Sequence, residues 1–404
     1  MRIACIAPYV PYEGIDHAGG LYLGQYLAAL RECGNEVTLF APRSEVNETA
    51  VEMGTAFPVV LTTARRASFP VLLLRLATQG STLPSGRAVL RRMPAAERNR
   101  LDEMDVIDLQ WFEYIVLAPA LRRKYPHKVI VGTAHDLVSQ SVERASKFAA
   151  SRIVRIKSSI KLPMLRRHEA FAINATDFTH VFKTSDIDEL RAMGVSTELG
   201  TTRPALEDME FDTTDRPNTE YPTIGFVAAF DRAENDEAAR WILQEVMPQV
   251  WAAQPEVRIR LAGTKPSPWL TSQNGPLVEV TGYLPLIADA YRGLDAIVVP
   301  LLRGAGLKFK TAQAMALGLP IVSTTIGQEG MRELFGVGPS RVADTAEGFA
   351  NEIIDVIGSL ERERILAGRI AGNVHGTSDL KAEVNAHSDR MLRIHTAKRP
   401  ETSR

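Results

Sequence analysis

Short apolar runs rich in β-branched residues alternate with helical patterns along most of the chain. This alternation is typical of βα units, in which helices join parallel strands and cover the sheet that they form. The first helical pattern begins near Gly19 and Gly20 and ends at Gly34. Strands in the first half are predicted at residues 3–7, 36–40, 106–109, 128–132 and 179–182. These elements predict a doubly wound α/β domain.

The alternation resumes after residues 206–222, a polar, proline-bearing stretch without periodic apolar residues that is predicted to be a linker. Strands are predicted beyond it at 223–228, 258–262, 278–281, 296–299 and 320–323, and helices at 237–251, 287–294 and 310–317. Because 404 residues exceed the usual size of one hydrophobic core, we expect two domains, at 1–205 and 223–375. Residues 376–404 are expected to form a helix that returns to the first domain, followed by a disordered tail.

The composition is that of an ordinary globular protein, with 45% hydrophobic residues, 24% charged residues and a net charge of -1. Cys5 and Cys33 are the only cysteines, which argues against a disulfide framework or a zinc site and favours a reducing cytosol. Prolines interrupt the N-terminal apolar run, so a buried strand is predicted there rather than a signal peptide. No apolar stretch reaches the roughly 18 residues of a membrane-spanning helix. We expect a cytoplasmic protein that binds no nucleic acid.

Residues 144–167 form a basic run with eight Lys or Arg residues and no Asp or Glu. Apolar residues such as Ile156 and Ile160 are interleaved with the cations between Arg144 and Arg167. Two interpretations remain open: a solvated helix face, or an amphipathic surface that contacts anionic lipid or a phosphorylated acceptor. A second basic stretch at 65–100, with Glu97 as its only acid, supports attachment at the inner face of the membrane.

A glycine-rich turn follows the predicted strand 296–299, at the edge of the sheet where open α/β folds bind ligands. Gly304 and Gly306 allow close approach of a ligand, and a helix opening near Lys308 presents free N–H groups to an anion. Lys308 or Arg303 is expected to neutralise a diphosphate; the alternative is a glycine turn with two exposed cations. The dinucleotide pattern G-x-G-x-x-G and the P-loop pattern G-x-x-x-x-G-K-[ST] are absent from the sequence.

The segment 303–331 resembles the donor-site signature of glycosyltransferase family 4, of group 1 type, R-L-K-x-x-E-A-M-A-x-G-x-P-V-V-S-T-x-x-G-x-E-G-L. Residues 226–241 and 280–301 resemble two further blocks of the same family. The resemblance implies the GT-B fold, in which two Rossmann-like doubly wound domains face a central cleft. The signature is matched by Leu307, Lys308, Ala314, Met315, Ala316, Gly318, Pro320, Val322, Ser323, Thr324, Gly327, Glu329 and Gly330.

The first half resembles the family more weakly, through Pro11 with the Gly19–Gly20 pair and through the strand and turn that end at His135 and Asp136. Such domains bind the acceptor, so the resemblance assigns acceptor contacts to His17, Gly19, Gly20 and Asp136. It places His135 near the reacting sugar as a catalytic residue. The alternative is a turn histidine whose ring is hydrogen-bonded by the backbone.

The chain departs from the family pattern at several positions. Ala305 and Gln313 occupy the positions of two glutamates, although the amide of Gln313 can still hydrogen-bond a ribose hydroxyl. Ala228 replaces a glycine, and Glu234 replaces the proline before Asn235. The Arg and Lys that many relatives carry in this loop are not clearly present, and Arg232 is a possible substitute.

The resemblance implies a retaining, metal-independent glycosyltransferase, such as a hexosyltransferase, that uses a nucleotide-diphosphate sugar and no cofactor. Carbohydrate or lipid-linked acceptors are implied, in polysaccharide, glycolipid or glycoconjugate synthesis. Lys308 and Arg303 would stabilise the leaving diphosphate. Two alternatives are an inactive scaffold subunit and a nucleotide-sugar 2-epimerase. The nucleotide pocket is expected to be lined by Gly263, Thr264, Tyr283 and Leu284.

Overall fold

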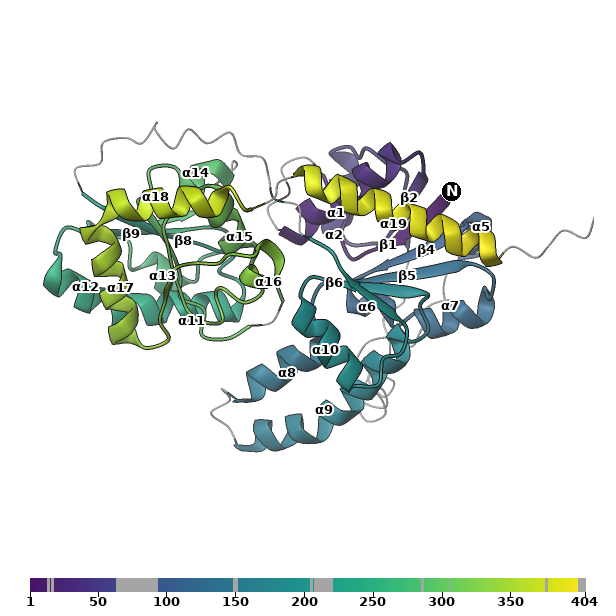
Figure 1. The fold of residues 1–404 in the computed structure, drawn as a ribbon, viewed down its shortest axis with the longest axis horizontal. Coiled ribbons are helices and arrows are strands. Elements are labelled where there is room, and N and C mark those ends of the chain that lie inside the picture. Colours follow the sequence, from purple (N-terminus) through teal and green to yellow (C-terminus); the bar gives the residue numbers. More distant parts are fainter. Residues whose placement is uncertain are drawn as a thin grey trace, which may run out of the picture. The chain divides into compact units, whose positions relative to one another are not determined.

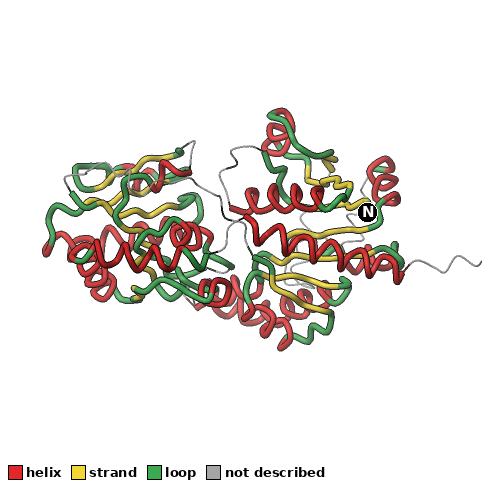
Figure 2. Tube along the Cα trace, turned by 45° about the horizontal axis from the view of Figure 1, so that its top comes forward, coloured by secondary structure: helices red, strands yellow, loops and turns green. Residues whose placement is uncertain are grey.

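The computed structural model describes residues 1–12, 15, 18–62, 94–147, 152–203, 206, 221–284, 287–304, 306–374 and 377–398. The chain forms two compact units. The first contains the described residues of Met1–Ile15, Gly19–Ala205 and Asp379–Arg404, and the second contains those of Leu206–Ser378 with Asp16–Ala18. Each unit is a sheet flanked by helices (Figures 1 and 2). No helix in the described ranges is long and apolar enough to cross a membrane.

The first unit contains a seven-stranded parallel sheet with the strand order β3-β2-β1-β4-β5-β6-β7. The order reverses on either side of β1, so the switch point lies between β1 and β4, where open α/β sheets form a ligand crevice. All five residues of β4 and all six of β5 are buried, as expected for strands covered on both faces. The strands are β1 Arg2–Ile6, β2 Glu36–Pro42, β3 Val59–Thr62, β4 Val106–Gln110, β5 Val129–Ala134, β6 Phe178–Val181 and β7 Glu198–Thr201.

Helices cover both faces of this sheet (Figure 1). The first helix buries Tyr22, Leu23 and Leu27 in the core, and Gly34, with φ of 79°, follows its end in the left-handed conformation that glycine adopts without strain. The helices are α1 Ala18–Glu32, α2 Glu45–Glu52, α5 Ala95–Glu103, α6 Phe112–Ile115, α7 Ala118–Lys124, α8 Val138–Lys147, α9 Arg152–Ile173 and α10 Thr184–Ala192.

The last helix, α19 (Thr377–Lys398), lies on the first unit (Figure 1). The Asn35 amide donates to the Ser388 hydroxyl over 2.9 Å, and the Lys398 ammonium pairs with Asp177 over 2.5 Å. From Asp379 onward the helix belongs to this unit. Its far end, residues 399–404, lies outside the described residues.

The second unit contains a six-stranded parallel sheet with the order β10-β9-β8-β11-β12-β13, whose switch point lies between β8 and β11. The strands are β8 Thr223–Val227, β9 Arg258–Ala262, β10 Val278–Gly282, β11 Ala296–Val299, β12 Ile321–Ser323 and β13 Arg341–Val342. The helices are α11 Ala233–Trp241, the π-helix η1 Ile242–Val246, α12 Met247–Ala253, α13 Pro268–Thr271, α14 Ile287–Tyr291, α15 Phe309–Ala316, α16 Met331–Phe335, α17 Ala346–Gly358 and α18 Leu360–Ala371.

The helix predicted at 237–251 differs from the structure at both ends and in its middle. It begins at Ala233, because Glu234 and Asp236 occupy its first turn, where acidic side chains interact favourably with the helix dipole. A π-helical turn at 242–246 precedes Pro248, which lacks the N–H of a regular helix. The residues from Ala233 to Ala253 are therefore helical throughout, in three segments.

Candidate functional site

The loops after β8 and β9 approach each other so closely that only glycine fits between them. Gly263 has φ of 146°, and a Cβ there would lie 1.8 Å from the carbonyl oxygen of Ala228. The Phe230 amide donates to the carbonyl of Thr264 over 2.9 Å and holds the loops together. Tyr283, 54% exposed, and the half-buried Leu284 follow β10 in the same sheet. That these residues line a base pocket stays a prediction.

In the loop after β11, the side chain of Lys308 bends back onto the backbone of the loop. Gly304 and Gly306 have φ of 136° and 71°, conformations that favour glycine. The buried Lys308 ammonium donates to the Gly306 carbonyl over 2.6 Å and lies 3.9 Å from a carboxylate oxygen of Glu329. Lys308 immediately precedes α15, whose N-terminus is the positive end of the helix dipole.

The other donor residues predicted from the sequence occupy different environments in the second unit. The guanidinium of Arg303 is half-buried and forms an ion pair with Glu237 on α11. Gln313 is buried on α15, one turn beyond its start. Ala305 lies outside the described residues. Glu237 engages only Nε of Arg303, so the N–H groups on Nη1 and Nη2 can still pair with a phosphate.

Lys310, in the first turn of α15, is a further cation that was not predicted from the sequence. Its ammonium donates to the Asn235 amide oxygen over 2.9 Å and lies 4.8 Å from the centre of the Phe226 ring. Burial of the amine, then the charges of Lys308 and Arg232, lower the pKa of Lys310 to about 7. In the family signature the lysine stands three residues before the glutamate of E-A-M-A. Gln313 occupies the position of that glutamate, so the signature lysine corresponds to Lys310 rather than to Lys308.

Arg232, Lys308 and Lys310 form what we call the cation cluster. Arg232 immediately precedes α11 and Lys308 immediately precedes α15, so two helix N-termini meet at the switch point between β8 and β11. The positive ends of two helix dipoles favour an anion there. Since the charges of Lys308 and Arg232 lower the affinity of Lys310 for protons, an anion that binds among the three cations relieves this repulsion.

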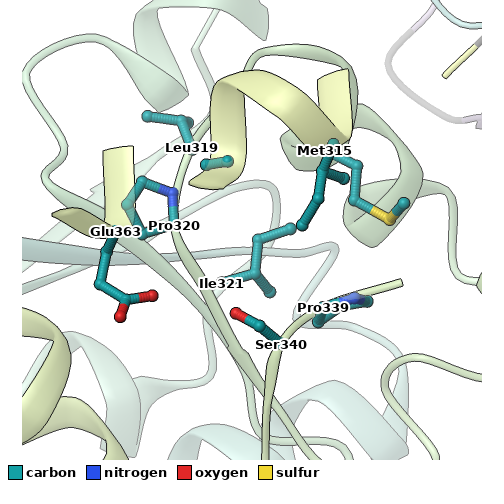
Figure 3. Close-up of a pocket in the computed structure, with 9 residues that line it drawn as sticks. Met315, Leu319, Pro320, Ile321, Pro339, Ser340 and Glu363 are labelled. Carbon is teal, nitrogen blue, oxygen red and sulfur yellow. The ribbon is translucent and has the colours of Figure 1, made fainter. Parts of the chain in front are cut away.

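The gap between α15, β12 and α18 is not a second ligand site (Figure 3). Its volume is about 10 Å³, which is room for a single water molecule. Met315, Ile321 and Glu363 line it, and Glu363 is already paired with Arg341 over 2.7 Å. We interpret it as a packing gap behind α15, the helix that carries Lys310.

His135 follows β5 in the first unit and lies within an aromatic cage. Its ring stacks on Trp111, with centroids 3.6 Å apart and planes 8° apart, while Tyr22 and Phe182 present their edges at 5.1 and 5.0 Å. Burial lowers the pKa of His135 to about 3, so the imidazole is neutral at physiological pH. The side-chain oxygen of Gln110 lies 3.3 Å from its Nε2. This ring therefore has a side-chain partner, in contrast to the alternative in which the backbone satisfies it.

Trp111 is a second residue that the sequence analysis missed. It follows β4 at the switch point and has φ of 66°, an unusual conformation for a bulky residue and one that tends to occur at functional sites. Its ring contacts that of Tyr9, with centroids 5.7 Å apart. The informative pattern was a tryptophan directly after a fully buried strand.

The predicted acceptor residues are only partly placed. Gly19 and Gly20 lie in the first turn of α1, just before Tyr22, whose ring contacts His135. Asp136 follows His135 and is half-buried. His17 lies outside the described residues. The structure thus brings the start of α1 to the His135 cage.

The basic run lies on α8 and α9, and part of its charge is neutralised. Arg166 pairs with Glu143 over 2.8 Å, and Lys147 pairs with the same carboxylate over 3.3 Å. Near the start of α9, by contrast, Ile156 and Ile160 are 51% and 67% exposed beside several cations. Residues 148–151 and most of the second basic stretch, 63–93, lie outside the described residues.

Comparison with known proteins finds a family match in the second unit and a shared fold for the chain. Residues 221–359 match a family described as Glycosyl transferases group 1. An uncharacterized 44.6 kDa protein in the cps region of Klebsiella pneumoniae is 25% identical over 143 residues, 31% of this chain and 34% of that protein. The match thus spans about a third of the relative's length.

Two solved structures resemble nearly the whole chain. Anabaena Alr3699/HepE, in complex with UDP and glucose, has a TM-score of 0.64 and 12% identity, with 97% of this chain and 99% of that chain covered. A glycosyltransferase from Rickettsia africae has a TM-score of 0.63 and 12% identity, with 97% and 98% covered. The two parallel sheets and these likenesses show the GT-B fold predicted from the sequence.

Proposed function

We propose that this chain, with its group 1 glycosyl transferase segment and GT-B fold, transfers a sugar from a nucleotide-diphosphate sugar to an acceptor hydroxyl. We further propose that it belongs to glycosyltransferase family 4 and retains the anomeric configuration. The observation that carries the proposal is the cation cluster, which lies within the matched segment at the β8–β11 switch point. The UDP and UDP-glucose complexes of Anabaena HepE support a nucleotide-sugar donor.

The cation cluster suits the step in which the glycosidic bond breaks. Negative charge then grows on the leaving diphosphate, and cations held in place beforehand stabilise that charge more than they stabilise the bound donor. The cluster supplies this charge without a metal ion. Gln313, in place of the family's glutamate, offers an amide to the ribose.

The acceptor hydroxyl attacks from the same face as the leaving group in the proposed reaction. Its proton passes to the leaving phosphate oxygen, so no enzyme carboxylate acts as a nucleophile. His135, neutral in its cage, orients the reacting sugar by hydrogen bonding rather than by charge. Trp111 and Tyr9 present aromatic surface close to it for a carbohydrate acceptor.

A donor screen tests the proposal. UDP, GDP, ADP and dTDP sugars are compared by thermal shift, because a ligand at 100 times its Kd stabilises the folded protein by about 2.7 kcal/mol. The selected donor is then incubated with and without carbohydrate acceptors. We expect one donor to stabilise the protein and its sugar to be transferred with retention. Binding without turnover would instead indicate a scaffold subunit, and an altered donor sugar formed without acceptor a 2-epimerase.

We also propose that α9 attaches the protein to an anionic membrane surface at the cytoplasmic side, near a lipid-linked acceptor. The exposed Ile156 and Ile160 lie beside basic side chains, an amphipathic arrangement that suits an interface. Co-sedimentation with anionic vesicles is expected to weaken at high salt and in an Ile156→Ser, Ile160→Ser double variant. Phe171→Ser, at an equally exposed position near the other end of α9, is the control. Binding indifferent to salt and anionic lipid would contradict the proposal.

A further inference from the structure

A chain of buried hydrogen bonds runs through the first unit from α19 to His135. The Tyr26 hydroxyl lies 2.9 Å from Nε2 of His387 and donates to Oδ2 of Asp108 over 2.7 Å. The other Asp108 oxygen accepts from Nε2 of Gln110 over 2.9 Å, and Oε1 of Gln110 lies 3.3 Å from Nε2 of His135. Four elements, α19, α1, β4 and the end of β5, thus contribute to one polar chain.

Asp108 is unusual because it is a fully buried carboxylate in the middle of a sheet. Within the described ranges no cationic side chain pairs with it. Its oxygens instead accept from the neutral Tyr26 and Gln110. Burial raises the pKa of Asp108 to about 6, against the lowering effect of these two donors. A buried carboxylate without a cationic partner costs stability, and such groups concentrate at functional sites.

The Asp108 carboxylate orients the amide of Gln110. The Gln110 nitrogen faces both Asp108 and the Thr133 hydroxyl, at 2.9 and 3.3 Å. A reversed amide would place its oxygen against the carboxylate, two acceptors with no proton between them. The amide oxygen must therefore face His135, and it can only accept a hydrogen bond. The neutral His135 ring meets this requirement with its proton on Nε2, which leaves Nδ1 as the acceptor nitrogen.

We infer that Asp108 and Gln110 are positioning residues that hold His135 as its Nε2–H tautomer, with Tyr26 anchoring Asp108 from the other side. The consequence for transfer rests on the proposed function, in which a neutral His135 orients the reacting sugar. The tautomer itself does not depend on that function. A purely structural polar core would have the same contacts and the same tautomer, but kcat would not change when the tautomer is shifted.

His387 closes the chain at its outer end. Since the Tyr26 hydroxyl gives its proton to Asp108, His387 must donate from Nε2. Its Nδ1 is buried and has no hydrogen-bond partner among the described residues. A cavity of about 340 Å³ adjoins Tyr26 and His387. Water in this cavity can replace the imidazole as a partner of Tyr26. The His387 contribution is therefore expected to be smaller than those of Asp108 and Gln110.

The tautomer of His135 is measured by two-dimensional ¹⁵N–¹H NMR of the histidine side chains in the full-length protein. The His135→Ala variant assigns the His135 signals. The wild-type protein is expected to show His135 protonated on Nε2. In Gln110→Met, which is similar in size but accepts no strong hydrogen bond, His135 is expected to shift toward the Nδ1–H form or a mixture. The rate constant kcat is expected to fall roughly 10-fold or more at unchanged donor KM. Asp108→Asn is likewise expected to shift His135 toward the Nδ1–H tautomer and to lower kcat.

Asp105→Asn is the matched control, because Asp105 lies just before the opposite end of β4 and accepts from the Arg2 amide, away from His135. Tautomer and kcat should both be unchanged in this variant. An Nδ1–H tautomer in the wild-type protein would overturn the inference even if no variant folded, as would a wild-type tautomer in Gln110→Met. A shifted tautomer with unchanged kcat would leave the inference standing and remove His135 from the proposed mechanism.

Discussion

Sugar transfer by a Lys310→Met variant is expected to be about 100-fold slower than by the wild-type enzyme, because a charge that stabilises the leaving diphosphate is lost. Methionine fills much of the same space beside Phe226 without the ammonium group. Lys308→Ala is expected to lower the rate by a similar factor of about 100. The measurement is kcat/KM with the donor found by the screen, together with the melting temperature of each variant.

Lys265→Met is the matched control. Lys265 lies on the loop after β9, its side chain is 75% exposed, and it pairs with Asp231 over 3.0 Å. Such exposed pairs contribute little, so near-normal transfer is expected. Near-normal transfer in Lys308→Ala or Lys310→Met would remove that lysine from the mechanism.

The low pKa of Lys310 gives donor binding a defined pH dependence. At pH values above about 7 the free enzyme carries a largely neutral Lys310, and a bound diphosphate raises its pKa, so binding takes up a proton. Donor affinity should therefore increase as the pH falls from about 9 toward 7, by up to about tenfold per unit, and level off below. The phosphates of a nucleotide sugar keep their charge over this range. Calorimetry in buffers of different ionisation enthalpy would detect the proton, and Lys310→Met should abolish the uptake.

A His135→Ala variant is expected to retain donor binding and lose about 100-fold in kcat. Donor binding should persist because His135 belongs to the first unit and the cation cluster to the second. The relevant measurements are kcat at saturating donor and acceptor, and the nucleotide Kd. His168→Ala is the control, since His168 is a partly buried histidine of α9 in the same unit that contacts Phe112. An unchanged kcat in His135→Ala would show that the His135 cage is structural.

The strands predicted from the sequence agree with the structure to within two residues, because buried parallel strands are continuous apolar runs that local composition reveals. Among the described strands, β3, β7 and β13 were missed. β3 and β7 lie at the two edges of the first sheet, and β13 lies at one edge of the second. Edge strands pair on one side only and need little apolar surface, as the exposed or half-buried residues of β7 show.

The candidate site was predictable where a motif occupies one stretch of sequence. The turn with Gly304 and Gly306 and the start of α15 lie close to their predicted positions. Lys310 was overlooked although the signature spacing contained it. Trp111 gave only a weak indication, since its φ of 66° and its stacking on His135 depend on β4 and β5 lying side by side.

The sequence by itself determined that this chain alternates strands and helices in two halves and places a glycine-rich cationic turn after a buried strand. Those properties depend on residues close together in the chain. Only the tertiary structure decided that Lys310 has a pKa near 7, because packing buries its amine and brings the charge of Arg232 to it from the start of α11. It likewise decided the tautomer that we infer for His135, since Asp108 and Gln110 act on it across neighbouring strands. Protonation depends on burial and on charges brought together in space, which local sequence does not specify.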